Sequence, residues 1–151
     1  MDKIFEPLKH EEEIYKFWEN NGFFKANVDS KKKPFSIILP PPNANGSLHM
    51  GHALFVYEDV MIRYNKMKGM ETLWLPGLDH AGIETQYVFE KELRKKGKSR
   101  FDFKREELYG MIFSFTKENM PNIRSQLRKL GFALDWSREK FTMDEDIVEI
   151  F

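Results

Sequence analysis

The sequence predicts an α/β fold in which helices flank a parallel sheet. Two short apolar segments, residues 35–39 and 72–75, have the composition of strands, and a proline closes each of them. A longer segment with apolar residues at helical spacing follows each strand. This strand–helix–strand–helix order is typical of parallel strands joined by crossover helices.

Apolar residues three and four positions apart predict four helices, at residues 10–21, 49–68, 81–96 and 103–131. The last of these segments contains Pro121, which predicts a kink or a new helix start at that point. The helix after the first strand is expected to be amphipathic. Its apolar residues at helical spacing are Met50, Ala53, Leu54, Tyr57, Val60, Met61 and Tyr64.

The final residues predict one more helix. Residues 142–145, Thr-Met-Asp-Glu, fit a capping box, in which the threonine hydroxyl and the glutamate each satisfy a backbone N–H group. Ile147, Val148 and Phe151 then continue an apolar face. Such a helix is shorter than the roughly 12–15 residues usually needed for autonomy, so we expect a truncated chain that is prone to self-association.

Composition excludes several classes of protein. The chain has 151 residues, which suits one domain with a substantial core. Its 24 basic and 24 acidic residues balance, so composition alone does not indicate a nucleic-acid-binding protein. It has no cysteine, no apolar run long enough to span a bilayer and no signal-peptide pattern. We therefore expect a cytoplasmic protein without a membrane partner.

The first motif is the most informative stretch of the chain: residues 40–52, with the sequence PPPNANGSLHMGH. It lies between the first strand and the next helix, so Gly46, His49, Gly51 and His52 are expected at the first turn of that helix. Free backbone N–H groups and the positive end of the helix dipole gather anions there. The motif therefore predicts a cradle for a nucleoside triphosphate. Alternatively, the histidines are surface residues or metal ligands, although a zinc site would need more ligands.

Three motifs in order resemble one enzyme family. The HMGH of the first motif resembles the HIGH signature of class I aminoacyl-tRNA synthetases, and its proline-rich lead is similar to their branched-chain subgroup. The second motif, residues 73–86 with the sequence LWLPGLDHAGIETQ, is similar to the PGTDHAGIATQ element of valyl-tRNA synthetases. The third motif, residues 126–145, also resembles that family. Isoleucyl and leucyl enzymes are the close alternatives, although their second motif normally differs.

The resemblance implies a Rossmann-like catalytic domain and gives roles to residues of the first two motifs. His49 and His52 would be catalytic, because their hydrogen bonds to the triphosphate would stabilise the charge that develops at the α-phosphorus. Asp79 would bind the ammonium group of the amino acid, with the Pro41 carbonyl and Asn43 beside it. The ATP-binding set would be Asn43, Gly46, His49, Gly51 and His52.

Each of these residues also has a plainer interpretation. Asp79 could cap the following helix, and Asn43 could form an Asx-turn. Gly51 would let a nucleotide approach the backbone, but it could equally be a helix irregularity. His80 matches the second motif without an assignable task. Three places depart from the usual residues of the family and concern its fine specificity: Leu78, Glu84 and the pair Ala44–Asn45.

The resemblance also implies an organisation and a set of partners. Residues 1–34 would form an N-terminal helical extension, and residues 35–151 the first part of the catalytic domain, ending before the editing insertion and the KMSKS loop. The partners would be valine, ATP with Mg²⁺, and tRNA(Val), with valyl-adenylate as the intermediate and no protein-bound metal. Basic residues in the segment 91–105 could meet a tRNA backbone, although a solvated helix end explains them more simply.

Two alternatives from other classes stay open at this stage. A catalytically incomplete fragment could bind only a nucleotide or a partner, since the chain contains no KMSKS motif. A dinucleotide-dependent oxidoreductase is disfavoured, because the chain lacks the G-x-G-x-x-G loop that such enzymes place against a pyrophosphate.

Overall fold

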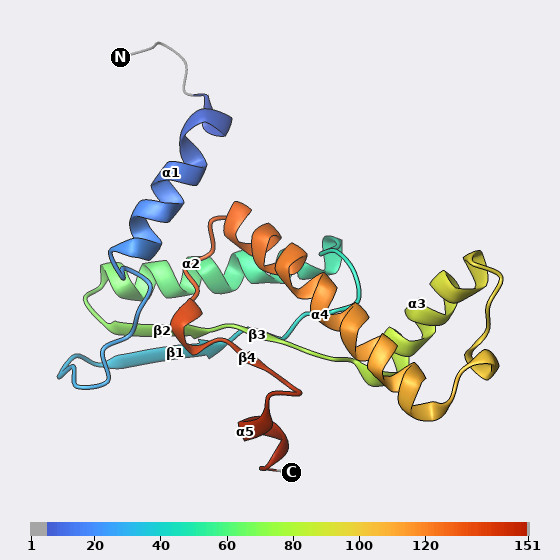
Figure 1. Cartoon of the computed structure of the whole chain (residues 1–151). Coiled ribbons are helices and arrows are strands. Elements are labelled where there is room, and N and C mark those ends of the chain that lie inside the picture. The colour runs from blue at the N-terminus through green and yellow to red at the C-terminus, as the bar shows by residue number, and fades with distance from the viewer. Residues whose placement is uncertain (1–5, 151) are drawn as a thin grey trace.

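A computed structural model describes residues 6–150 and confirms the α/β fold (Figure 1). The helices are α1 (Pro7–Asn20), α2 (Leu54–Met67), α3 (Gly82–Lys95), α4 (Arg105–Lys129) and the short α5 (Glu145–Val148). The strands are β1 (Pro34–Ile38), β2 (Glu71–Leu75), β3 (Gly77–Leu78) and β4 (Lys140–Phe141). Residues 6–150 also contain three 3₁₀ turns: η1 (Met50–Ala53), η2 (Arg100–Asp102) and η3 (Trp136–Arg138).

The strands are parallel, as predicted. β1 pairs with β2 in a register that runs from Pro34 opposite Glu71 to Ile38 opposite Leu75. Beyond Pro76, which has no N–H to donate, the chain resumes as β3 and pairs in parallel with β4. The two-residue strand β4 was not predicted, because so short a segment carries no periodic signal.

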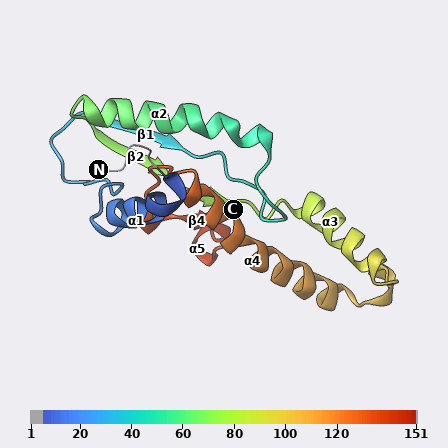
Figure 2. The same ribbon diagram turned by 90° about the horizontal axis from the view of Figure 1, so that it is seen from above.

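Helices cover one face of these strands within residues 6–150. Figures 1 and 2 show α1, α2 and α4 on the same side, with only the short α5 on the other. Trp74 of β2 lies at the centre of the covered face, where its ring is 5.3 Å from that of Phe132 and its Nε1 donates to Glu58 of α2 at 3.1 Å. On the opposite face of β1, Ile38 is 71% exposed. The prediction of flanking helices therefore holds for one face of the described sheet.

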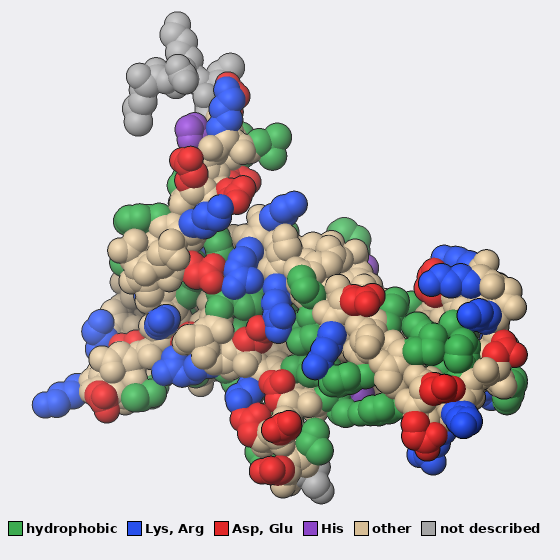
Figure 3. All heavy atoms as spheres, viewed as in Figure 1, with side chains coloured by type: hydrophobic (Ala, Val, Ile, Leu, Met, Phe, Trp, Pro, Cys, Tyr) green, Lys and Arg blue, Asp and Glu red, His purple; other side chains and the backbone are tan. Residues whose placement is uncertain are grey.

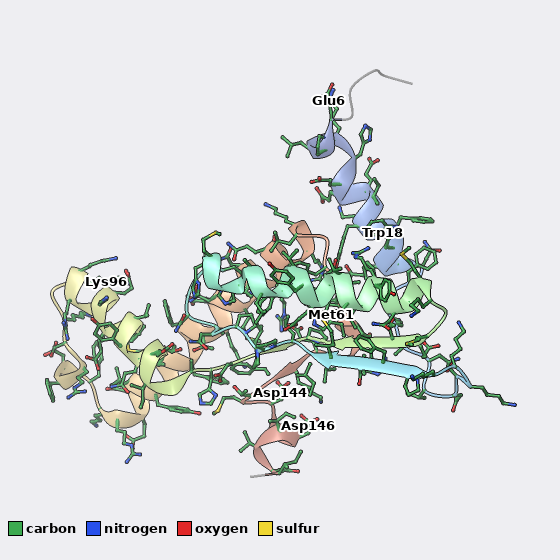
Figure 4. The ribbon with its side chains drawn as sticks, turned by 180° about the vertical axis from the view of Figure 1, so that it is seen from behind. Glu6, Trp18, Met61, Lys96, Asp144 and Asp146 are labelled. Atoms are coloured by element: carbon green, nitrogen blue, oxygen red, sulfur yellow. The ribbon has the colours of Figure 1, made fainter. Side chains whose placement is uncertain are left out.

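The face of α2 that is buried differs from the apolar face that its sequence predicts. Its buried apolar residues are Phe55 and Ile62, while Glu58 and Asp59 also face inward. Asp59 accepts from the backbone N–H of Ala133 at 2.9 Å, which fixes this orientation. Figure 4 shows the outer side of α2, with Met61 labelled. Every residue of the predicted apolar pattern is therefore exposed, and so are Val56 and Met67; the pattern consists of Met50, Ala53, Leu54, Tyr57, Val60, Met61 and Tyr64.

The lower part of α1 is joined to the turn that follows α4. Tyr15 donates to the carbonyl of Phe132 at 2.9 Å and accepts from Trp136 Nε1 at 2.8 Å. Burial raises the pKa of Tyr15 to about 12. Arg128 forms two hydrogen bonds with Glu19, at 2.9 and 3.0 Å, in the same region. The other end of α1 projects from the body and carries charged side chains of both signs (Figure 3).

The long helix α4 continues through Pro121 without a break, so the prediction of a new helix start there is wrong. Pro121 is exposed, and nearby side chains hydrogen-bond to carbonyls of the preceding turns: Thr116 to Ile112 at 3.0 Å and Asn119 to Phe115 at 2.8 Å. The N-terminal half of α4 packs on α3 as a projecting arm (Figure 1). None of the helices in residues 6–150 is long and apolar enough to cross a bilayer.

Candidate functional site

The first and second motifs meet beyond the carboxyl ends of β1 and β3, where open parallel sheets bind ligands. The backbones of Asn43 and Asp79 pair as a parallel bridge. Ala44 N donates to the Asp79 carbonyl at 2.7 Å, and Asp79 N donates to the Pro42 carbonyl at 2.9 Å. The two predicted motifs therefore meet through backbone hydrogen bonds. These bonds fix the position of one motif relative to the other.

Two side chains of α4 hold the far end of the first motif. Gln126 accepts from the backbone N–H of Leu48 at 2.8 Å, and Asn122 donates to the hydroxyl of Ser47 at 3.0 Å. The loop is therefore fastened to the second motif at one end and to α4 at the other. These contacts hold the residues directly before His49, and so they help to position the two histidines.

The histidines lie on a 3₁₀ turn and not, as predicted, on the first turn of an α-helix. His49 precedes η1, and α2 begins only at Leu54. The Nδ1 of His49 accepts from Gly51 N at 3.1 Å, while the Nδ1 of His52 accepts from His49 N at 2.9 Å. His52 N donates to the His49 carbonyl at 2.9 Å. These three N–H groups are thus occupied within the turn, which contradicts the expectation that they are free for an anion.

The same hydrogen bonds define the protonation of both rings. A neutral imidazole carries one proton, and a nitrogen that accepts a hydrogen bond does not hold it. The Nδ1 of His52 also lies 3.2 Å from the His49 carbonyl, but the His49 N–H at 2.9 Å can only donate to it, so this contact and that of His49 both favour the proton of the neutral ring on Nε2. Burial lowers the pKa of His52, which favours the neutral form, and the two ring centroids lie 4.2 Å apart. The turn therefore presents two adjacent Nε2–H donors.

Gly51 is required by the turn itself. A Cβ at this position would lie 2.8 Å from Cε1 and 3.0 Å from Nδ1 of His49, closer than side chains normally approach. The absence of a side chain at Gly51 therefore makes room for the His49 ring. Gly46 differs, because it lies in the preceding loop and a Cβ there would meet no atom within 4 Å.

Asp79 does not cap α3. The residue at the cap position is Ala81, in a left-handed conformation with φ of 43°, and no side chain caps that helix. The Oδ1 of Asp79 accepts from Ala81 N at 3.0 Å and from the Thr142 hydroxyl at 3.1 Å. No residue in the described range donates to its Oδ2, and the side chain is 35% exposed. The carboxylate is thus held by one oxygen and open at the other.

Thr142 is the site residue that sequence reasoning missed. The predicted capping box is wrong, because Asp144 stands at the cap of α5 and its side chain accepts from Phe141 N, not from an N–H group of α5, while Thr142 contacts the second motif. Besides its bond to Asp79, its hydroxyl accepts from His80 N at 2.9 Å and lies 2.7 Å from His80 Nδ1. The strand pair β3–β4 brings Thr142 there, and only recognition of β4 could have revealed it.

Asn43 and Pro41 complete the predicted set. Asn43 donates from its side-chain amide to Glu84 of α3, one of the positions that depart from the usual family residue. Pro41 is exposed beside Gly77, where a Cβ would lie 3.6 Å from the Pro41 ring. A groove of about 1110 Å³ between α1 and α4 lies apart from the site and is lined by none of these residues. Within residues 6–150, no three His, Asp or Glu side chains gather as a metal site.

Comparison with known proteins agrees with the motifs and the fold. Residues 13–150 match the family described as "tRNA synthetases class I (I, L, M and V)", and the chain belongs to that family. Its fold is similar to that of a LeuRS from Agrobacterium radiobacter, solved in a ternary complex with tRNA and LeuAMS. The TM-score is 0.77 at 20% identity, covering 96% of this chain and 17% of that one.

Curated relatives narrow the resemblance to one amino acid. The chain is 49% identical to the valine–tRNA ligase of Gloeobacter violaceus over 97% of its own length, and 49% identical to that of Chlamydia muridarum over 95%. It spans 17% and 16% of the length of these two relatives. The resemblance to valyl-tRNA synthetases is therefore confirmed over nearly the whole chain.

Proposed function

We propose that this chain forms the part of a valine–tRNA ligase that receives ATP and valine for the synthesis of valyl-adenylate. In that reaction a carboxylate oxygen of valine attacks the α-phosphorus of ATP, and pyrophosphate leaves. The valyl group would then pass to the terminal ribose of tRNA(Val). The observation that carries the proposal is the pairing of Asn43 with Asp79, which unites the two motifs at one sheet edge.

The two motifs suit opposite ends of the reacting pair. The Nε2–H donors of His49 and His52 would bind phosphate oxygens and stabilise the charge that grows on them during attack. The open Oδ2 of Asp79 would accept a charge-assisted hydrogen bond from the ammonium group of valine. The carbonyl of Pro41 and the amide of Asn43 would contribute beside it. Catalysis would then rest on positioning and charge stabilisation.

Mg²⁺ would enter as the partner of ATP. Its charge would neutralise the phosphate oxygens, and those oxygens with water would supply its ligands, because Mg²⁺ usually keeps several waters. We further propose a cytoplasmic location, and self-association through the exposed Val148 and Ile150 of the last turn. Phe151, which the sequence analysis also placed on this apolar face, lies outside the described residues.

Valine-dependent ATP–pyrophosphate exchange tests the proposal. A chimera would carry residues 1–151 in place of the matching stretch of the Gloeobacter violaceus valine–tRNA ligase. We expect it to exchange pyrophosphate with valine and far more slowly with leucine. The unaltered relative is the positive control, and a chimera with both His49→Ala and His52→Ala is the negative one. A folded chimera that binds ATP without valine-dependent exchange would instead support a chain that binds nucleotide only.

A further inference from the structure

The hydroxyl of Thr142 has three polar neighbours but only one proton. The backbone N–H of His80, at 2.9 Å, can only donate, so it takes one lone pair of the hydroxyl oxygen. An ionised Asp79 carboxylate can only accept, so the hydroxyl proton goes to its Oδ1 at 3.1 Å. One lone pair remains for His80 Nδ1 at 2.7 Å. This arrangement favours a proton on that nitrogen, which also lies 3.4 Å from Asp79 Oδ1.

His80 is thus the opposite tautomer of the two histidines of the first motif. In the neutral ring the proton on Nδ1 leaves Nε2 as an acceptor. No residue in the described range donates to this Nε2, which lies near the start of α3, where a Cβ at Gly82 would be 3.7 Å away. The His80 side chain is 43% exposed and can meet a ligand. The second motif therefore presents lone pairs where the first presents N–H groups.

We propose that Thr142 is a positioning residue that makes the second motif an acceptor-only site for the ammonium group of the amino acid. It holds one oxygen of Asp79, which leaves Oδ2 for the substrate, and it selects the tautomer in which His80 Nε2 accepts. An ammonium group has three N–H donors. Asp79 Oδ2, His80 Nε2 and the Pro41 carbonyl would be the acceptors for them. The identity of the ligand, an ammonium group, rests on the proposed function, whereas the arrangement around Thr142 does not.

Histidine tautomers test the first step in the chain itself. Long-range ¹H–¹⁵N correlation spectra, recorded at about pH 8 where histidine is neutral, distinguish a protonated Nδ1 from a protonated Nε2. We expect Nδ1–H in His80 and Nε2–H in His49 and His52, with each ring assigned through a single His→Gln variant. Thr142→Val keeps the shape without the hydroxyl and should remove the preference of His80, whereas Thr142→Ser should retain it. A protonated Nε2 in His80 of the unaltered chain would overturn the inference.

Exchange kinetics in the chimera test the second step. Thr142→Val should raise the KM for valine about tenfold, the usual loss of one hydrogen bond to a charged group, while the KM for ATP stays within about twofold. Thr142→Ser should restore the valine KM. Thr116→Val, which removes another buried hydroxyl, one that donates to the Ile112 carbonyl within α4, is the matched control and should change neither KM. Melting curves of every variant exclude unfolding as the cause.

The outcomes separate this inference from the proposed function. Equal changes in both KM values after Thr142→Val, or no change in either, would contradict a positioning role. A chimera without any exchange would refute the proposed function, and the tautomer spectra would still decide the arrangement around Thr142. A valine effect that Thr142→Ser does not rescue would also overturn the role of the hydroxyl.

Discussion

The two histidine-bearing motifs of the site are held in place in different ways. The first motif arranges His49 and His52 through hydrogen bonds within four consecutive residues. The second arranges Asp79 and His80 through Thr142, a residue 62 positions beyond His80. The first arrangement can form wherever that turn forms, whereas the second exists only after β4 has paired with β3. The first arrangement therefore depends on local hydrogen bonds alone, whereas the second depends on tertiary structure.

The comparison also has a chemical side. The first motif offers N–H donors because both of its imidazole Nδ1 atoms accept from the backbone. The second offers acceptors because a single hydroxyl contacts both Asp79 and His80. A substrate pair with an anionic triphosphate and a cationic ammonium group matches this division. The same residue type, histidine, serves both ends because its surroundings select its tautomer.

The largest expected effect comes from removing a donor of the first motif. His49→Ala or His52→Ala in the chimera should slow valine-dependent exchange by about 10²-fold or more, which is the usual loss for one charge-stabilising donor. Loss in kcat with little change in the valine KM would assign the donor to the transition state. Near-normal exchange in both variants would remove the first motif from catalysis.

A smaller effect is expected from crowding the turn without removing a histidine. Gly51→Ala places a Cβ 2.8 Å from the His49 ring, so the ring must swing away and lose its bond from the backbone. The loss of one such bond corresponds to up to about tenfold in exchange rate. Gly110→Ala on α4 is the matched control, because a Cβ there meets no atom within 4 Å and the residue is not part of the site. Equal losses in the two variants would show that the space beside Gly51 is unimportant.

The smallest expected effect is a loss of folding stability at acidic pH through protonation of His52. Its pKa is lower in the folded chain than the ordinary 6.5, so the unfolded chain binds the proton more readily. The contribution of this group to stability is therefore complete above about pH 6.5 and declines as the pH falls below it. Urea unfolding between about pH 8 and pH 5 should show a larger loss for the unaltered chain than for His52→Gln. The opposite order would mean that protonation of His52 favours the folded state.

Part of this site was predictable from the sequence, for a physical reason. Parallel strands end at a common edge, so motifs that follow two such strands must approach each other, and Asn43 and Asp79 do pair. The occupied N–H groups of His49 and Gly51 were not predicted, because histidine is not among the usual capping residues. The rules for helix ends gave the wrong start for α2 for that reason.

The other misses come from contacts between distant parts of the chain. Thr142 fits a local capping pattern, but the pairing of β4 with β3 draws its hydroxyl to Asp79 instead. The orientation of α2 was likewise set by a distant partner, since Asp59 turns inward to meet the N–H of Ala133. In both cases a tertiary hydrogen bond overrides a pattern that sequence spacing alone supports.

The most direct test of the division between the motifs is a crossed measurement of substrate KM values in the chimera. Asp79→Asn keeps the size of the side chain but removes its charge, so it should raise the valine KM about tenfold or more and leave the ATP KM within about twofold. His52→Ala should lower kcat and affect the ATP KM more than the valine KM. If both variants instead raise both KM values equally, the two motifs do not bind opposite ends of the substrate pair.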